Sequence, residues 1–459
     1  MHYKRAFAVL NLMALIRSSP VHAHASEQGF VLLLPTDLYT GAGVVAVFLT
    51  LLILMIVPGR VVDRVFRPVP FGRPRLARVK AVTTMVSSIL VLVLIWVGFN
   101  GPSDPLANPL VLMVWVVFWI ALVSIQGFVG DIWSFISPFS GALRLARWSF
   151  GSWRFAPLSP RIGYWPAVIG FLLFGFVLLA DPAPADPRHL ARVVAGYTVF
   201  QMGFILVYGP RWLLRGEVFT VLMRTYGKAS ILGRGAVGAP GWQIVLGARV
   251  PLAVAILCVL LLGTGSFDGL NETFWWMGQL GMNPLEFSGR SAVVVQNTVG
   301  MVLANAGLLV IFTVTLFLGL RLASHDLAIP AAFKLFAPTL LPIALGYHIA
   351  HYLPSFLVDS QYALVALSDP LMNGSDWLGL GEFYVTTGFF NAKDSVRTIY
   401  LTQAGAVVIG HILAVLTAHC VALRVFKSHK KAVLSQVPLA VFMVIYTFFG
   451  LWLLASPRF

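Results

Sequence analysis

Charged residues are scarce in this chain. Only 11% of its 459 residues are charged, whereas 58% are hydrophobic, and the mean hydropathy is +0.86. Soluble domains carry about 25% charged residues. The shortage of charge therefore excludes an ordinary soluble globule and predicts a polytopic integral membrane protein.

Cysteines and several well-known catalytic motifs are also scarce or absent. The two cysteines, Cys258 and Cys420, lie far apart and both fall inside apolar runs. A disulfide framework or a cysteine-based metal site is thereby excluded, and we expect both to be small buried residues. The sequence contains no P-loop, no G-x-S-x-G and no H-E-x-x-H. Kinase, serine-hydrolase and zincin functions therefore have no signature here.

The net charge of +15 does not indicate nucleic-acid binding. The Lys and Arg residues lie in short loops between apolar runs, and no basic face with interleaved aromatics is seen. This is the distribution that the positive-inside rule describes for membrane proteins. We therefore expect the lipid bilayer, and no nucleic acid, among the partners of this chain.

The first 25 residues are typical of a secretory signal. Two basic residues precede a short apolar stretch at 6–16, and Ala23 and Ala25 each end a small-x-small cleavage pattern. We expect a signal peptide over residues 1–25, cleaved after Ala23 or Ala25, with an uncleaved first helix as the alternative. Cleavage after Ala23 leaves His24 as the new N-terminus, where the α-amine and the imidazole together could bind Cu(II).

Ten apolar runs follow in the remaining single domain, residues 26–459. They are predicted as membrane spans at 42–57, 81–99, 109–129, 163–180, 190–209, 244–263, 292–320, 331–358, 400–425 and 437–454, with long polar loops at 265–291 and 359–398. Every second loop is basic, which places these loops in the cytoplasm. The cleaved signal independently gives the same orientation. We predict an all-α bundle of about ten transmembrane helices in a bacterial inner (plasma) membrane, with both mature ends periplasmic.

The eighth run contains the most informative polar residues. His348 and His351 are three positions apart and flanked by Tyr347 and Tyr352. Three-residue spacing places both histidines on one face of a helix. Polar groups in a membrane span usually face a cavity or a partner. The pair therefore favours a metal site or proton relay open to the outside, with interhelical packing as the alternative.

Other histidines and carboxylates could complete such a site. His411 in the ninth run lies near mid-membrane and could join His348 if the two helices touch. Outer-side carboxylates could act as ligands or as a general base; they are Asp37, Asp268, Glu272, Asp359, Asp369 and Asp376. We expect Asp359 or Asp268 to be the catalytic base.

Several stretches, taken in order, resemble a bacterial family of multi-pass membrane proteins named fenitrothion hydrolase after an organophosphorus triester. They are His24 with the polar lead-in to the first span, Gly130-Asp131-Ile132-Trp133 with Ser137-Pro138, Arg215 to Phe219, Thr264 to Leu270, Pro342 to Tyr352, Ser368 to Leu371, Asp376-Trp377, Gly410-His411 and Ala418-His419. Together they extend over nearly the whole mature chain. The resemblance implies a phosphoric triester hydrolase that acts on lipophilic small molecules and releases a nitrophenol.

Combined with the histidines, the resemblance predicts a metal-assisted site in the outer half of the bundle. We expect a divalent ion, zinc or copper, held by His351 with His348, His411 or His24. Two alternatives stay open. The same histidines could lie on the path of a permease or of a metal (copper) handling protein, or the chain could be a non-catalytic membrane subunit that needs a second subunit. No internal repeat supports an inverted-repeat transporter.

Overall fold

The computed structural model describes residues 31, 33–72, 76–150, 155–286 and 289–458. Within these ranges the chain is a helical bundle, and nine helices are long and apolar enough to cross a membrane. The predicted all-α membrane architecture is therefore confirmed, and the chain is a multi-pass membrane protein. The predicted signal peptide, with His24, lies outside the described residues.

All ten predicted spans are helical. The nine long segments are α3 (Thr36–Ile56), α5 (Ala77–Asn100), α6 (Pro109–Leu112) continued by η1 (Met113–Leu122) and α7 (Val123–Phe128), α11 (Pro187–Tyr208), α15 (Leu252–Asn271), η3 (Arg290–Val293) with α17 (Val294–Leu322), α18 (Ile329–Phe336) with η4 (Ala337–Leu340) and α19 (Leu341–Ser368), α20 (Lys393–Phe426) and α21 (His429–Ala455). The tenth, α10 (Trp165–Leu179), has 15 residues. That is about 22 Å of helix, shorter than the hydrocarbon core.

Short elements connect these spans. The helices are α4 (Gly59–Val65), α8 (Trp133–Ile136), α9 (Pro138–Phe150), α12 (Pro210–Arg215), α13 (Val218–Tyr226), α14 (Trp242–Val245), α16 (Phe274–Gln279), η2 (Pro284–Glu286) and η5 (Gly388–Asn391). Three two-residue strands, β1 (Val69–Pro70), β2 (Leu232–Gly233) and β3 (Ala236–Val237), form an antiparallel sheet in the order β1-β3-β2. Val237 pairs with both Val69 and Leu232.

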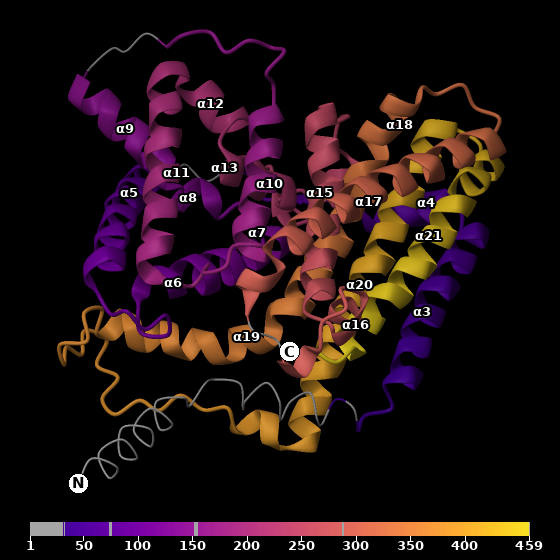
Figure 1. The fold of residues 1–459 in the computed structure, drawn as a ribbon. Helices are drawn as coiled ribbons and strands as arrows, with labels where there is room; N and C mark the ends of the chain where they lie inside the picture. Colours follow the sequence, from indigo (N-terminus) through magenta and orange to yellow (C-terminus); the bar gives the residue numbers. More distant parts are fainter. Residues whose placement is uncertain (1–30, 32, 73–75, 151–154, 287–288, 459) are drawn as a thin grey trace.

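The bundle has a central helix and lipid-facing outer helices. In α15, 83% of the most apolar window is buried, compared with 22% in α3 and 28% in α5. Figure 1 shows α3 and α5 at opposite edges of the molecule with α15 between them. Exposed apolar side chains on the outer helices are expected where lipid replaces water as the solvent, so α15 is the element best placed to hold polar groups away from lipid.

Two helix boundaries differ from the sequence prediction. The sixth span begins at Leu252 after Pro251, because residues 242–245 form the separate helix α14, and it ends at Asn271. Asp268 therefore lies in the last turn of α15 rather than in the loop predicted at 265–291. Similarly, α19 continues through Pro354 to Ser368, so that Asp359 is helical rather than the first residue of the loop predicted at 359–398.

Packing explains why α19 continues past its proline. Proline removes one intrahelical hydrogen bond and usually kinks or ends a helix. Beyond Pro354, however, Ala363 and Ala366 form a buried cluster with Leu112 and Val116 of α6 and η1. Figure 1 shows this last part of α19 passing beneath α6. The burial of this apolar face stabilises helical structure where the sequence indicated a loop.

The first half of α19 lies directly against α20. A Cβ atom on Gly346 would come within 2.4 Å of the carbonyl oxygen of Ala406, which is closer than side chains tolerate. Small residues of this kind allow membrane helices to pack backbone against backbone. This contact fixes the position of the histidine-containing turns of α19 in the centre of the bundle.

Candidate functional site

Five polar side chains meet where α15 ends. We call them the outer cluster: Asp268 and Glu272 from the end of α15, His351 and Tyr352 from α19, and Arg458 from the tail after α21. Asp268 and Glu272 are four residues apart and so share one helix face. His351 and Tyr352 precede Pro354 by less than one turn. The cluster therefore joins three segments that are distant in sequence.

Asp268, Glu272 and His351 converge closely enough to share a ligand. One oxygen or nitrogen atom from each lies within 4.8 Å of the others. His351 Nε2 is 3.3 Å from Asp268 Oδ2, and these two side chains are 6% and 9% exposed. The Glu272 side chain is 35% exposed. The cluster thus extends from a buried interior to a partly accessible outer edge.

Aromatic residues hold the buried part of the outer cluster in place. The Tyr352 hydroxyl donates a hydrogen bond to Asp268 Oδ2, the oxygen that faces His351. The Tyr347 ring stacks on the His351 ring, with centroids 6.0 Å apart and an angle of 8°. A Cβ atom on Gly269 would lie 1.8 Å from the Tyr347 hydroxyl oxygen, so any larger residue at 269 would displace the Tyr347 ring from this position.

Arg458 supplies the cationic group of the outer cluster. One guanidinium nitrogen, Nη1, lies 3.3 Å from His351 Nδ1 and 3.7 Å from Glu272 Oε2. The tail is held by a hydrogen bond from the Phe274 amide to the Pro457 carbonyl, 3.0 Å long. Because a guanidinium group can only donate, His351 Nδ1 must accept. The ring proton then resides on Nε2, facing Asp268.

Sequence reasoning did not include Arg458 in the site. It is 107 positions from His351 and belongs to a chain terminus that carries no motif. One signal could have drawn attention to it: Arg458 is a cation beyond the tenth span, on the side predicted to be poor in Lys and Arg. Such an exception is more informative than another cation in a basic loop.

The other predicted histidine ligands have different partners. His348 Nε2 lies 3.0 Å from the Trp119 carbonyl oxygen, and its ring packs edge-on against the Trp119 indole. His411 Nδ1 lies 2.9 Å from the carbonyl oxygen of Val407 on its own helix. The converging ligand atoms belong to Asp268, Glu272 and His351. The structure therefore does not bring His348 or His411 together with His351 as ligands of one site.

The structure also separates Asp359 from the outer cluster. Asp359 lies eight residues after His351 on the same helix, about 12 Å along its axis, and is half-buried. Of the two predicted bases, Asp268 contacts His351. His24, the remaining predicted histidine ligand, lies outside the described residues.

The donor set of the outer cluster fits a divalent metal. One imidazole nitrogen and two carboxylates suit zinc, whereas the thiolates preferred by copper(I) are missing, since both cysteines are buried elsewhere. Two ligands at 2.0–2.1 Å from a tetrahedral ion lie roughly 3.3–3.4 Å apart. The 3.3 Å between His351 Nε2 and Asp268 Oδ2 fits that spacing and also fits a hydrogen bond, so His351 can ligate an ion through Nε2 only when the ring proton moves to Nδ1 in place of the Arg458 contact.

Two polar motifs elsewhere have structural roles. Gln126 Oε1 accepts hydrogen bonds from the amides of Ile132 and Trp133 and so shapes the turn at Gly130-Asp131. Glu217 caps α13 by accepting from the amides of Phe219 and Thr220. Caps and turns of this kind satisfy backbone donors at helix starts. These motifs position helices rather than form a second site.

Comparison with known proteins identified no relative of this chain. No family model, curated protein or solved structure matches the chain. The outer cluster is therefore interpreted from its own geometry.

Proposed function

We propose that the chain is a membrane-embedded, metal-assisted hydrolase of lipophilic organophosphorus triesters such as fenitrothion, releasing a nitrophenol. Asp268, Glu272 and His351 are the proposed metal ligands, with zinc the best match to their donor atoms. The observation that carries the proposal is the convergence of these three side chains within 4.8 Å at the end of a membrane helix. The ordered resemblance to fenitrothion hydrolases supplies the substrate class.

The residues of the outer cluster take distinct parts in this proposal. A divalent cation at the site would polarise the phosphoryl bond and make a water molecule a stronger nucleophile. Glu272, the more exposed carboxylate, could ligate through one oxygen and accept a proton on the other, while Tyr352 fixes the orientation of Asp268. The Arg458 guanidinium lies beside them and suits a phosphoryl oxygen. A nitrophenolate leaving group needs little help from an acid.

The location of the outer cluster suits a substrate that dissolves in lipid. Asp268 lies in the last turn of a membrane-spanning helix, and Glu272 at its end is partly exposed. A triester that accumulates at the bilayer surface can reach such a site without crossing the membrane. By the positive-inside pattern we place this end of α15 on the periplasmic face of a bacterial inner membrane.

Metal content and nitrophenol release, measured on the same detergent-purified sample, test the proposal. Wild type is compared with His351→Gln and with the matched control His411→Gln, another buried histidine. We expect stoichiometric metal and release in wild type and His411→Gln, and loss of both in His351→Gln. Full metal binding and turnover in His351→Gln, or no metal in folded wild type, would refute the metal-assisted mechanism.

One observation favours a second candidate function, a permease or metal-handling protein. The outer cluster forms a series of polar contacts from the buried interior to the partly exposed edge, in the order Tyr352, Asp268, His351, Arg458 and Glu272. Such a series could relay protons or pass a cation. Solute or metal uptake into vesicles under an imposed gradient, without nitrophenol release in detergent, would favour this function.

A further inference from the structure

A cavity lined by cationic side chains lies at the opposite end of α15 from the outer cluster. Its volume is about 390 Å³, and its lining includes Lys228, Arg249, Lys334 and Arg424 together with His325. Val250, which also lines the cavity, lies two residues before α15 begins at Leu252, and the 16 helical steps from Leu252 to Asp268 extend about 24 Å. The two sites are therefore separated by roughly the thickness of a bilayer core.

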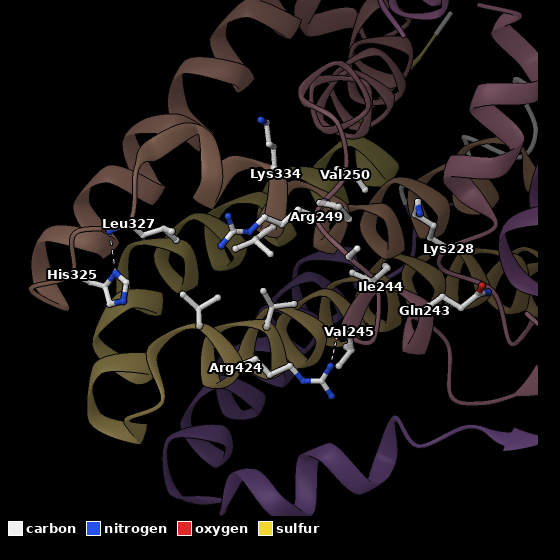
Figure 2. Close-up of a pocket in the computed structure, with 16 residues that line it drawn as sticks. Lys228, Gln243, Ile244, Val245, Arg249, Val250, His325, Leu327, Lys334 and Arg424 are labelled. Atoms are coloured by element: carbon white, nitrogen blue, oxygen red, sulfur yellow. Dashed lines mark hydrogen bonds between the residues drawn. The ribbon is translucent and has the colours of Figure 1, made fainter. Parts of the chain in front are cut away.

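The four cationic residues that line the cavity come from four segments, and His325 and Leu327 come from a fifth, the link between α17 and α18. Arg249 comes from the link between α14 and α15, Lys334 from α18, Arg424 from α20 and Lys228 from the turn after α13. Figure 2 shows Arg249 in the middle of the view, with His325 on one side and Lys228 on the other. Apolar side chains such as Leu327, Leu335 and Val421 complete the lining. Cationic residues from separate segments thus line one space.

Most of this positive charge is not neutralised by the protein. Arg424 lies 3.4 Å from Asp63 and donates to the Val245 carbonyl. Within the described part of the chain, no carboxylate lines the cavity, and none forms an ion pair with Lys228, Arg249 or Lys334. The uncompensated cations create a local positive potential that favours an anion.

The environment of Lys228 indicates the same preference. Burial lowers the pKa of this ammonium group, and the nearby Arg234 and Arg224 lower it further. A charged lysine in such a position gains most from an anionic partner, because an opposite charge favours the charged form. His325 adds a hydrogen-bond donor: its Nδ1 accepts from the Leu327 amide at 3.0 Å, which leaves the proton of the neutral ring on Nε2.

The positive-inside rule alone does not explain this arrangement. It accounts for cations at this end of the bundle but not for their convergence on one cavity. Arg211 of α12 and Lys430 in the first turn of α21, for example, are exposed cations that do not line it. We propose that the cavity binds a phosphate group, carried either by an anionic lipid headgroup or by a free phosphorylated solute.

The dimensions and lining of the cavity suit that ligand. Small-molecule sites range from roughly 300 to 1,000 Å³, so the cavity accommodates a headgroup-sized anion rather than a large cofactor. Arginine binds phosphate through two parallel hydrogen bonds, and lysines add point charges. Basic pockets between membrane helices on the cytoplasmic side are a recognised form of phospholipid site. The apolar part of the lining would contact the glycerol or acyl portion of a lipid.

Two binding measurements on the full-length protein test this proposal. In detergent, thermal unfolding is followed with inorganic phosphate or with chloride at equal ionic strength. In nanodiscs of phosphatidylcholine with or without phosphatidylglycerol, copurifying anionic lipid is quantified by mass spectrometry. The variants are Arg249→Gln and Lys334→Gln, and Arg211→Gln and Lys430→Gln are the matched controls. Arg249→Lys tests whether charge alone restores binding.

Each outcome separates the alternatives. A phosphate-specific rise in unfolding temperature, with affinity weakened about tenfold or more in Arg249→Gln but not in the controls, supports a free phosphorylated solute. No phosphate effect, but retention of phosphatidylglycerol that is lost in Arg249→Gln and Lys334→Gln, supports a lipid headgroup. If neither ligand binds, or if the cavity variants bind as well as the controls, the proposal is overturned. None of these results depends on triester hydrolysis.

Discussion

Replacing Arg458 with glutamine tests the metal assignment of the outer cluster directly. The guanidinium lies 3.3 Å from His351 Nδ1 and 3.7 Å from Glu272 Oε2, so it occupies space beside two of the proposed ligands. It also repels any cation bound there. Removing its charge should therefore strengthen metal binding, although the loss of its hydrogen bonds should weaken the fold.

The size of the effect follows from the distances. A unit charge and a divalent ion 4 Å apart interact by about 8 kcal/mol at an effective dielectric constant of 20. The Arg458 and Glu272 side chains are 17% and 35% exposed, so solvent screens much of this interaction. Taking about a sixth of it gives roughly 1.4 kcal/mol, a tenfold change in affinity. We expect Arg458→Gln to bind zinc about tenfold more tightly than wild type.

The assay is competition for zinc with a calibrated chelator, accompanied by thermal unfolding in detergent. Arg397→Gln is the matched control, because Arg397 is an exposed arginine in the first two turns of α20 and is not among the contacts of the outer cluster. Arg458→Gln should also lose triester hydrolysis if the guanidinium binds the phosphoryl oxygen. Unchanged or weaker zinc affinity in a folded Arg458→Gln protein would show that the metal does not bind beside this group.

Two further predictions concern packing and pH. Gly269→Ala should lower the unfolding temperature by an amount that corresponds to about 1–3 kcal/mol, because the new Cβ would collide with the Tyr347 hydroxyl. Gly265→Ala is the control and should be tolerated, because the nearest atom to its new Cβ is 3.7 Å away. Equal losses of stability in the two variants would contradict the contact between Gly269 and Tyr347. The hydrogen bond from Ser368, with backbone amides, holds the pKa of Asp376 below its usual range. The ionised Asp376 carboxylate therefore stabilises the loop above its unfolded pKa, and this stabilisation is lost as the pH falls through its lower folded pKa. Amide hydrogen exchange at residues 376–381 should become faster over that pH range in wild type, and Asp376→Asn should lack this pH-dependent change.

Local sequence determined the membrane architecture. Hydropathy is a property of each run by itself, so all ten spans were predictable, including the short α10 (Trp165–Leu179). The burial of Cys258 and Cys420 followed for the same reason. The polar character of the eighth span also marked α19 as the element to examine, because polar groups are costly inside a membrane.

The tertiary structure decided the composition of the outer cluster. His348 and His351 share a broad face of α19, but their side chains point about 60° apart around the helix. That difference is enough to direct His348 to the Trp119 carbonyl of η1 and His351 to Asp268 of α15. Arg458 joins them because the tail pairs with the start of α16, a contact that no local pattern encodes. Spacing along a helix therefore fixed which side chains share a face, and only helix packing fixed what each one meets.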